Sequence, residues 1–334
     1  MVYQGEARAS DSQETSKINA FASEAQSIER NSNHMIKIRI GIVTFNNSRE
    51  QIKRLLESIS TSAALLRKNV ALDLSVAGID NGESCFEQSA KSASLVSPIN
   101  VITMPTSGNI GFGRAMNLLM SQAFAPTDDS AMTVETAIEL FIAVNPDGLF
   151  HHHCLSELIA AAMTSNEALL EARQFPEEHP KPYSIATGDT PWATGACLAI
   201  PRKLYETIGG FDENLFLYGE DVDFSWRAKA AGFAIKLVHD AIFVHPTLGR
   251  VWSREAKKHF FLSSVYLAAK WHAEDFQRIY EEQFRSRFAQ SEDIDLLNTA
   301  IKAAKKASSN IVNTTGFKPF FDEGKSFSVA RWTY

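Results

Sequence analysis

Cysteine is scarce in this sequence of 334 residues, and its three cysteines, Cys85, Cys154 and Cys197, stand far apart along the chain. An odd number of widely spaced cysteines indicates neither a disulfide framework nor a cysteine-based metal site. Free thiols persist in a reducing compartment, so we expect a cytoplasmic protein.

Long apolar runs and an excess of basic residues are missing as well. No run reaches the roughly 18 apolar residues that a membrane-spanning helix needs, and the N-terminus lacks the pattern of a signal peptide. A net charge of -6 gives no long-range attraction to nucleic acid, which we therefore do not expect as a partner. With 45% hydrophobic residues, the chain has enough apolar side chains to bury a large core and should be soluble.

The composition changes along the chain and suggests three regions. Residues 1–34 are rich in Ser, Glu, Gln and Asn and hold few large apolar side chains, which predicts a flexible or weakly helical extension. Residues 35–252 show regular patterning and form the expected main domain. Residues 253–334 read as an appended helical region, with apolar faces up to about Ser309.

The main domain alternates apolar strands with amphipathic helices, which is the order of βαβ units and predicts a parallel sheet in an α/β fold. A Pro-rich, charged stretch from Glu171 to Pro191 separates the two halves and carries no predicted strand. The predicted strands are 36–44, 72–79, 100–104, 140–144, 195–200, 234–238 and 241–244, and the predicted helices are 49–67, 111–124, 152–165, one from 202, and 220–231.

Polar residues stand where several predicted strands end: Thr44, Asn46, Asp80, Asn109 and Asp147. In parallel α/β sheets, ligands bind beyond the carboxyl ends of the strands, so these residues are candidates for a binding site. Asp80 could accept hydrogen bonds from a nucleoside, or it could serve only the turn that Asp-Asn-Gly favours.

The segment Ser107 to Gly113 combines glycines with the start of a predicted helix, a setting that suits a diphosphate. Its spacing departs from both the dinucleotide-binding and the Walker patterns. The sequence therefore does not indicate a Rossmann or P-loop site at this turn.

Acidic residues and one histidine suggest metal and base chemistry. Asp147, in Asn-Pro-Asp-Gly, offers the oxygen ligand that Mg²⁺ or Mn²⁺ prefers, although such a segment also forms plain turns. His245 follows a strand and could equally be a core or capping histidine. Glu220, Asp221 and Asp223 begin a helix, where acids also favour the helix dipole. Adjacent histidines at 151–153 point in different directions and would make poor zinc ligands.

Five ordered motifs resemble glycosyltransferase family 2, of the GT-A fold, and within it the rhamnosyltransferase-like branch. The resemblance covers roughly residues 38–245. Its motifs are Val43-Thr44-Phe45-Asn46, Ile79-Asp80-Asn81-Gly82, the run from Asn109 to Asn117, Asn145-Pro146-Asp147, and a closing set that includes Gly209-Gly210-Phe211-Asp212, Gly219-Glu220-Asp221-Val222-Asp223 and His245.

The resemblance implies roles for single residues. Asp147 matches the metal-binding acid of the D-x-D element, whose first position is Asn145 here, and His245 matches a distal histidine of the same metal site. Asp221 matches the general base that activates the acceptor hydroxyl, and Asp223 would be a structural acid. Thr44, Asn46 and Asp80 would line a nucleoside pocket, and Asn109, Gly111 and Arg114 would lie beside the diphosphate or ribose.

The acceptor or sugar side would include Glu220, Gly195 and Trp192. Trp192 could form an apolar platform for a sugar face, and a buried core tryptophan is the competing interpretation. The cofactor implied is a divalent cation, Mg²⁺ or Mn²⁺, and the donor a dTDP- or UDP-linked sugar.

The activity implied is an inverting transfer to a hydroxyl of a growing cell-surface glycan or glycolipid. L-Rhamnose is the first choice of sugar. Galactofuranose, galactose and N-acetylglucosamine remain alternatives because Phe260-Phe261 lacks the Arg-Asn pair that often follows in the rhamnosyl branch. A silent nucleotide-sugar or glycan-binding module on the same fold is a further alternative. A nucleotidyltransferase would want a basic, Gly-rich loop near residue 44 that is not there.

The C-terminal helices allow several interpretations. They could brace the main domain, mediate a homodimer, shape the acceptor site or contact the inner face of the membrane as a peripheral element. A packing brace is the simplest of these.

Overall fold

The computed structural model describes residues 34–126, 135–165, 167–247, 249, 251–329 and 331. The predicted N-terminal extension, apart from His34, and most of the polar insertion after Pro126 lie outside the described residues. Within this part of the chain, no helix is long and apolar enough to cross a membrane.

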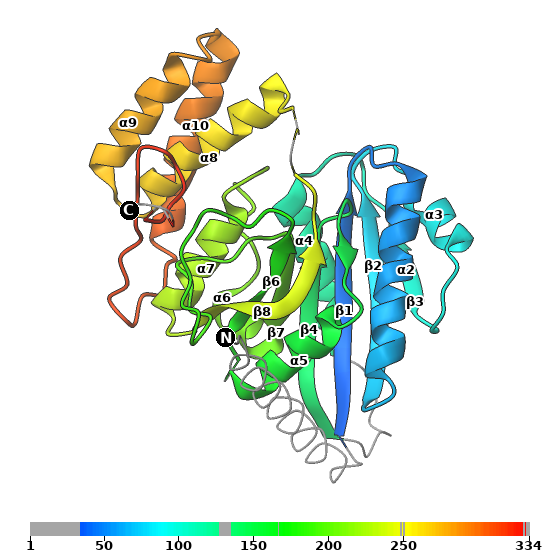
Figure 1. Cartoon of the computed structure of the whole chain (residues 1–334). Coiled ribbons are helices and arrows are strands. Elements are labelled where there is room, and N and C mark those ends of the chain that lie inside the picture. Colours follow the sequence, from blue (N-terminus) through cyan, green and yellow to red (C-terminus); the bar gives the residue numbers. More distant parts are fainter. Residues whose placement is uncertain are drawn as a thin grey trace, which may run out of the picture.

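Eight strands form one sheet in the order β3-β2-β1-β4-β7-β6-β8-β5 (Figure 1). Their bounds are β1 His34–Thr44, β2 Ala71–Asp80, β3 Asn100–Met104, β4 Glu135–Val144, β5 Leu149–Phe150, β6 Leu169–Phe175, β7 Cys197–Pro201 and β8 Ile235–Val244. β1 pairs in parallel with β2 and β4, and β6 pairs in parallel with β8. β7 runs antiparallel to both β4 and β6, so β1, β2, β4, β6 and β8 all end at the same edge of the sheet.

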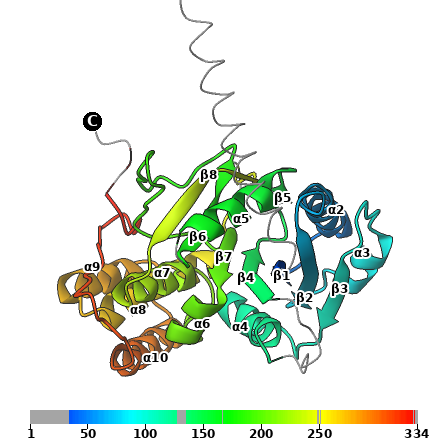
Figure 2. The same ribbon diagram turned by 90° about the horizontal axis from the view of Figure 1, so that it is seen from below.

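Helices cover both faces of the sheet (Figure 2). On one face, α2 (Arg49–Leu66), α3 (Phe86–Ser92) and α5 (Cys154–Thr164) bury apolar side chains such as Leu55 and Leu158 against the alternating residues of β1. On the other face, α4 (Phe112–Ala123), α6 (Arg202–Ile208) and α7 (Glu220–Ala230) build a second core around Phe141 and Phe224. Alternation along each strand supplies both cores, because successive side chains point to opposite faces.

Three further helices, α8 (Arg254–Lys270), α9 (Glu274–Arg285) and α10 (Ser291–Ser308), pack beside α7 and away from the sheet (Figures 1 and 2). A third core joins them to the main domain, with Trp226 of α7 surrounded by Trp271, Phe321 and Phe327. The C-terminal region is therefore continuous with the main domain through a shared apolar core.

A buried charge cluster ties the same two regions together. Asp223, fully buried, accepts hydrogen bonds from Arg227 Nε over 2.7 Å and from Trp271 Nε1 over 3.2 Å. Lys270 Nζ lies 2.7 Å from Asp223 and 2.6 Å from Asp212. Asp223 thus holds the C-terminal helices against α7, in agreement with the structural role expected for it.

The structure corrects the prediction for the Pro-rich stretch. β6 overlaps its first residues and lies inside the sheet between β7 and β8. Its polar residues misled the prediction because their buried partners cannot be recognised from the local pattern: Glu171, 1% exposed, forms an ion pair with Lys181, 1% exposed, over 2.7 Å. The two strands predicted at 234–238 and 241–244 are one strand, β8, which continues past an irregularity in its pairing with β6. α3 was not predicted.

Candidate functional site

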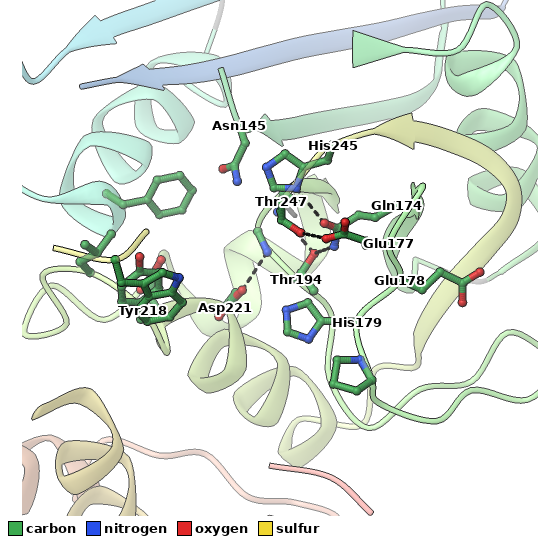
Figure 3. Close-up of a pocket in the computed structure, with 17 residues that line it drawn as sticks. Asn145, Gln174, Glu177, Glu178, His179, Thr194, Tyr218, Asp221, His245 and Thr247 are labelled. Carbon is green, nitrogen blue, oxygen red and sulfur yellow. Dashed lines mark hydrogen bonds between the residues drawn. The ribbon is translucent and has the colours of Figure 1, made fainter. Parts of the chain in front are cut away.

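A cavity of about 580 Å³ opens at the sheet edge where β4, β6 and β8 end, opposite the start of α7 (Figure 3). Strand ends supply one wall, and the first turn of α7 supplies the facing wall. The lining residues are Phe112, Asn145, Gln174, Glu177, Glu178, His179, Pro180, Thr194, Gly195, Ala196, Leu217, Tyr218, Glu220, Asp221, His245, Thr247 and Trp252. Five predicted site residues are among them: Asn145, Gly195, Glu220, Asp221 and His245.

His245, 4% exposed, has polar partners on both ring nitrogens, of which Figure 3 shows Gln174. Its Nδ1 lies 2.8 Å from Oε1 of Gln174, and its Nε2 lies 3.2 Å from Oδ1 of Asp147. Gln174 in turn donates from Nε2 to the hydroxyl of Thr194 over 2.9 Å. The two residues predicted for a metal site, Asp147 and His245, are therefore brought together, although they stand 98 residues apart.

These two groups fit a divalent cation bound together with a substrate. A carboxylate oxygen and an imidazole nitrogen are both suitable ligands for Mn²⁺, and Mg²⁺ is typically held by one or two carboxylates plus substrate phosphates. Across the described ranges, no group of three or more His, Cys, Asp or Glu residues is arranged to hold a metal ion. Among the described residues, Asp147 and His245 would supply the ligands, and the remaining ligands would come from a diphosphate and from water.

Asp221 lies at the start of α7 with both carboxylate oxygens fixed. Oδ2 accepts a hydrogen bond from the backbone N–H of Gly195 over 2.9 Å, and Oδ1 accepts one from the N–H of Val222 over 2.9 Å. Burial raises the pKa of Asp221, and these N–H groups together with the Lys181 ammonium oppose that rise. An oriented carboxylate with a raised pKa is suited to accept a proton from a substrate hydroxyl.

Glu220 adjoins Asp221 and is 6% exposed. Its Oε2 has no hydrogen-bond partner within the described part of the chain. Burial and the neighbouring Asp221 raise the pKa of Glu220 to about 8, because two carboxylates this close cannot both ionise easily. Glu220 is thus mainly protonated at neutral pH and can donate a hydrogen bond into the cavity.

A second group of predicted residues meets at the ends of β1 and β2. The buried hydroxyl of Thr44 donates to Oδ1 of Asp80 over 3.0 Å. The same oxygen accepts the N–H groups of Gly82 and Ser84 over 3.1 and 3.2 Å, and Asn46 Oδ1 accepts the N–H of Glu83 over 3.1 Å. Asp80 and Asn46 therefore both organise the turn after β2. Contact with a nucleoside stays a prediction for Thr44, Asn46 and Asp80.

The glycine-rich turn before α4 is built by contacts within the chain. Gly111, at φ 87°, donates its N–H to Oδ1 of Asn109 over 3.0 Å, and Phe112 donates its N–H to the carbonyl of Phe216 over 3.1 Å. Arg114 is exposed and donates from Nε to the carbonyl of Glu213 over 2.9 Å. Two N–H groups expected to face a diphosphate are thus already bonded, and a role for Asn109, Gly111 and Arg114 beside the donor stays a prediction.

The structure corrects the position of Trp192. Its ring is 5% exposed in the third core, Nε1 donates to the carbonyl of Ser326 over 3.0 Å, and Lys181 Nζ lies 4.3 Å from its ring centroid. Trp192 does not line the cavity, because core packing encloses both the ring and its N–H. The competing interpretation of a buried core tryptophan is the one the structure supports.

Other aromatic side chains line the cavity instead. Tyr218 and Trp252 stack with ring centroids 4.9 Å apart and an interplanar angle of 10°, and Trp252 is 37% exposed. Tyr218 has a positive φ of 68°, a conformation that is uncommon for a residue other than glycine and often marks a functional site. The sequence held a signal for this pair, since Tyr218 directly precedes the Gly219-Glu220-Asp221 segment, but Trp252 follows the last strand without any motif.

Gln174 and Thr194 were missed altogether. Gln174 lies in the segment predicted to be a loop, and Thr194 precedes a predicted strand without a pattern of its own. Their role depends on β6, β7 and β8 being neighbours in the sheet, which the local sequence does not reveal.

Comparison with known proteins shows which proteins this chain resembles. The model of the family described as "Glycosyltransferase like family 2" matches residues 161–292. An N-acetylglucosaminyl-diphospho-decaprenol L-rhamnosyltransferase of Mycobacterium tuberculosis (strain H37Rv) is 26% identical over 212 residues, which cover 51% of this chain and 67% of that protein. The O-antigen biosynthesis protein RfbC of Myxococcus xanthus is 31% identical over 70 residues, which cover 19% of this chain and 6% of that protein.

A solved structure described as GalNAc-T7 with UDP, GalNAc and Mn²⁺ is similar in fold, with a TM-score of 0.53 and 13% sequence identity. The match covers 83% of this chain but only 55% of that one. The predicted GT-A fold and the predicted resemblance to family 2, with rhamnosyltransferases among the relatives, are confirmed.

Proposed function

We propose that this chain, whose residues 161–292 match the model of glycosyltransferase family 2 and whose fold is GT-A, belongs to that family and is an inverting glycosyltransferase. It would move a sugar from a nucleoside diphosphate to a hydroxyl of a growing cell-surface glycan or glycolipid. The observation that carries the proposal is that a fixed carboxylate, Asp221, and a histidine, His245, line one cavity, with Asp147 3.2 Å from the His245 ring.

Asp221 would act as the general base. As the acceptor oxygen forms its bond to the anomeric carbon, the bond from that carbon to the diphosphate breaks, and Asp221 takes the hydroxyl proton. Positioned proton acceptors contribute roughly 100-fold to 10,000-fold to such steps. Because Gly195 and Val222 already hold both oxygens of Asp221, little reorientation would be needed at the moment of transfer.

Asp147 and His245 would hold the divalent cation, which would neutralise negative charge on the departing diphosphate. Asn145, at the first position of the D-x-D element, lines the same wall and would contact the donor. Asn145 carries no charge, so the protein contributes one carboxylate less to the cation than a D-x-D with two aspartates would.

The acceptor would enter between Glu220 and the Tyr218–Trp252 pair. A protonated Glu220 donates one hydrogen bond, and the exposed part of Trp252 offers an apolar surface for a sugar ring. L-Rhamnose is the first choice of transferred sugar, supported by the mycobacterial relative, with dTDP or UDP as the nucleotide.

A screen of nucleotide sugars tests the proposal. dTDP-rhamnose, UDP-galactofuranose, UDP-galactose and UDP-N-acetylglucosamine would each be incubated with the protein and Mn²⁺, and ¹H NMR would follow nucleotide release and the anomeric configuration of the released sugar. We expect one donor to react with inversion. Retention would contradict the direct displacement, and nucleotide binding without turnover of any donor would support a silent module.

A further inference from the structure

We propose that Gln174 and Thr194 are positioning residues that hold His245 in the tautomer with its proton on Nδ1, leaving the Nε2 lone pair for a cation beside Asp147. The role of this cation rests on the proposed function. Neither residue belongs to any of the motifs found in the sequence.

The hydrogen-bond partners define the tautomer. Oε1 of Gln174 can only accept, so the bond of 2.8 Å to His245 requires a proton on Nδ1. In the neutral ring, Nε2 then carries a lone pair, and it faces Oδ1 of Asp147 over 3.2 Å. A divalent cation would bind this lone pair and the carboxylate oxygen together, whereas a proton on Nε2 would form a hydrogen bond to Asp147 instead.

Gln174 can fix the orientation of the His245 ring because it is buried. Gln174 is 6% exposed and Thr194 is 4% exposed, so water has little access to replace either group. The Thr194 hydroxyl accepts from Nε2 of Gln174 over 2.9 Å, which directs the amide oxygen toward the imidazole (Figure 3). Partners of this kind fix the orientation of metal-binding histidines, and their loss typically lowers metal affinity roughly 10-fold to 100-fold.

The turn that contains Thr194 also helps to position Asp221, the proposed base. Gly195 follows Thr194 directly and donates its N–H to Asp221 over 2.9 Å. Thr194 and Gly195 therefore connect the cation side of the cavity to the base side through two consecutive residues. A change at Gln174 should act on the cation side and leave the Gly195–Asp221 bond in place.

The first test is the protonation of His245 in the cation-free protein. ¹⁵N NMR of histidine-labelled protein, with the His245 signals assigned by their loss in His245→Asn, reports which ring nitrogen carries hydrogen. We expect a protonated Nδ1 and a bare Nε2 at pH 7.5. A proton on Nε2, alone or together with Nδ1, would overturn the inference, because a hydrogen bond to Asp147 would then replace the cation site.

The second test is Mn²⁺ affinity, measured by electron paramagnetic resonance of free Mn²⁺, alone and with UDP or dTDP. Gln174→Leu should weaken binding roughly 10-fold to 100-fold, and Gln174→Glu, which still accepts from Nδ1, should retain most of the affinity. Thr194→Val should weaken it less. Thr190→Val is the matched control: Thr190 is a buried threonine of the same loop whose hydroxyl lies within hydrogen-bond distance of the carbonyls of Pro182 and Trp192.

Equal affinity of Gln174→Leu and wild type, with both folded by circular dichroism, would overturn the inference, as would a wild type that binds no Mn²⁺ in any titration. Neither measurement depends on sugar transfer. A protein that passes both tests but transfers no sugar would refute the proposed function alone, and a transferase with the opposite tautomer would refute only the role of Gln174 and Thr194.

Discussion

The backbone N–H of Gly195 donates a hydrogen bond of 2.9 Å to Oδ2 of Asp221, and this bond joins the turn before β7 to the start of α7. The N–H of Val222 holds the other oxygen. Asp221 is therefore an oriented carboxylate at the wall of a cavity, whereas Asp223, two residues later, is fully buried and neutralised by Arg227 and Lys270. Two acids that look alike in the sequence thus have different environments.

Replacing the proposed base should separate binding from transfer. Asp221→Asn keeps the shape of the side chain but cannot accept the proton, so the transfer rate should fall roughly 100-fold to 10,000-fold. Donor affinity, measured by calorimetry, should stay close to that of the wild type. Asp240→Asn, an exposed acid on β8, is the control and should leave the rate unchanged. An unchanged rate in Asp221→Asn would refute the assignment of the base.

Glu220 should make stability fall as pH rises. Its pKa is raised to about 8 by burial and by Asp221, so between the ordinary value of 4.5 and about 8 the folded state binds more protons than the unfolded state. The free energy of unfolding therefore decreases across this window. Because glutamine does not titrate, Glu220→Gln should lack this decrease in the free energy of unfolding. Urea unfolding should show a variant similar to wild type near pH 5 and more stable at pH 8, by an amount on the order of 1 kcal/mol or more. Parallel curves for the two proteins would contradict the raised pKa.

The two tryptophans near the cavity should behave differently when truncated. Trp252→Ala removes a partly exposed ring that lines the cavity, so the KM for the acceptor should rise with little change in Tm. Trp192→Ala removes a ring from the third core and should cost about 3–5 kcal/mol of stability. Acceptor kinetics and thermal unfolding of both variants distinguish the roles. A Trp252 variant with wild-type KM would exclude it from the acceptor site.

Lys270 should be a strong determinant of stability. It is 3% exposed and lies between Asp212 and Asp223, and its loss would leave two buried carboxylates without their shared cation. Lys270→Met should therefore destabilise the protein by roughly 3–5 kcal/mol, as measured by urea unfolding. Lys257→Met, at an exposed position of the same helix, is the control and should have little effect. Equal stability of the two variants would show that the cluster does not hold the C-terminal helices.

Asp212 should make the stability that this cluster provides depend on pH in the acid range. Burial alone would raise its pKa, but Lys270 and the hydroxyl of Tyr266 outweigh burial and lower the pKa to about 2, from an ordinary value of 3.8. The stability from this group is complete above pH 3.8 and is lost as pH falls toward 2. In Lys270→Met the pKa of Asp212 should be lowered less, so the free energy of unfolding should fall less between pH 3.8 and pH 2 than it does in the wild type.

Local patterns in the sequence predicted much of the fold. The alternation of apolar residues located β1, β2 and β3 and the helices α2, α4 and α7 to within about two residues. β6 was missed because Glu171 and Gln174 were interpreted as loop residues, and only their partners in the folded chain, Lys181 and His245, explain polar side chains inside the sheet. Trp192 and Trp252 show the same limit: which tryptophan lines the cavity depends on how the C-terminal helices pack.

The sequence motifs identified Asp147, Asp221 and His245, and the fold brings Asp147 and His245 into contact. Gln174 and Thr194 could not be found in this way. They lie near His245 because β6, β7 and β8 are neighbours in the sheet, not because they belong to a local motif. The order of the strands depends on the packing of the whole domain.

Nucleotide release from the donor found in the screen, measured with Mn²⁺ or with EDTA for wild type, Asp147→Ala and Asp221→Asn, tests the central claim most directly. We expect the wild type to release nucleotide only with Mn²⁺ and Asp221→Asn to bind the donor without releasing nucleotide. Asp147→Ala should lose the Mn²⁺-dependent binding itself. Equal release by all three proteins, or release that EDTA does not affect, would contradict the separate roles of Asp147 and Asp221.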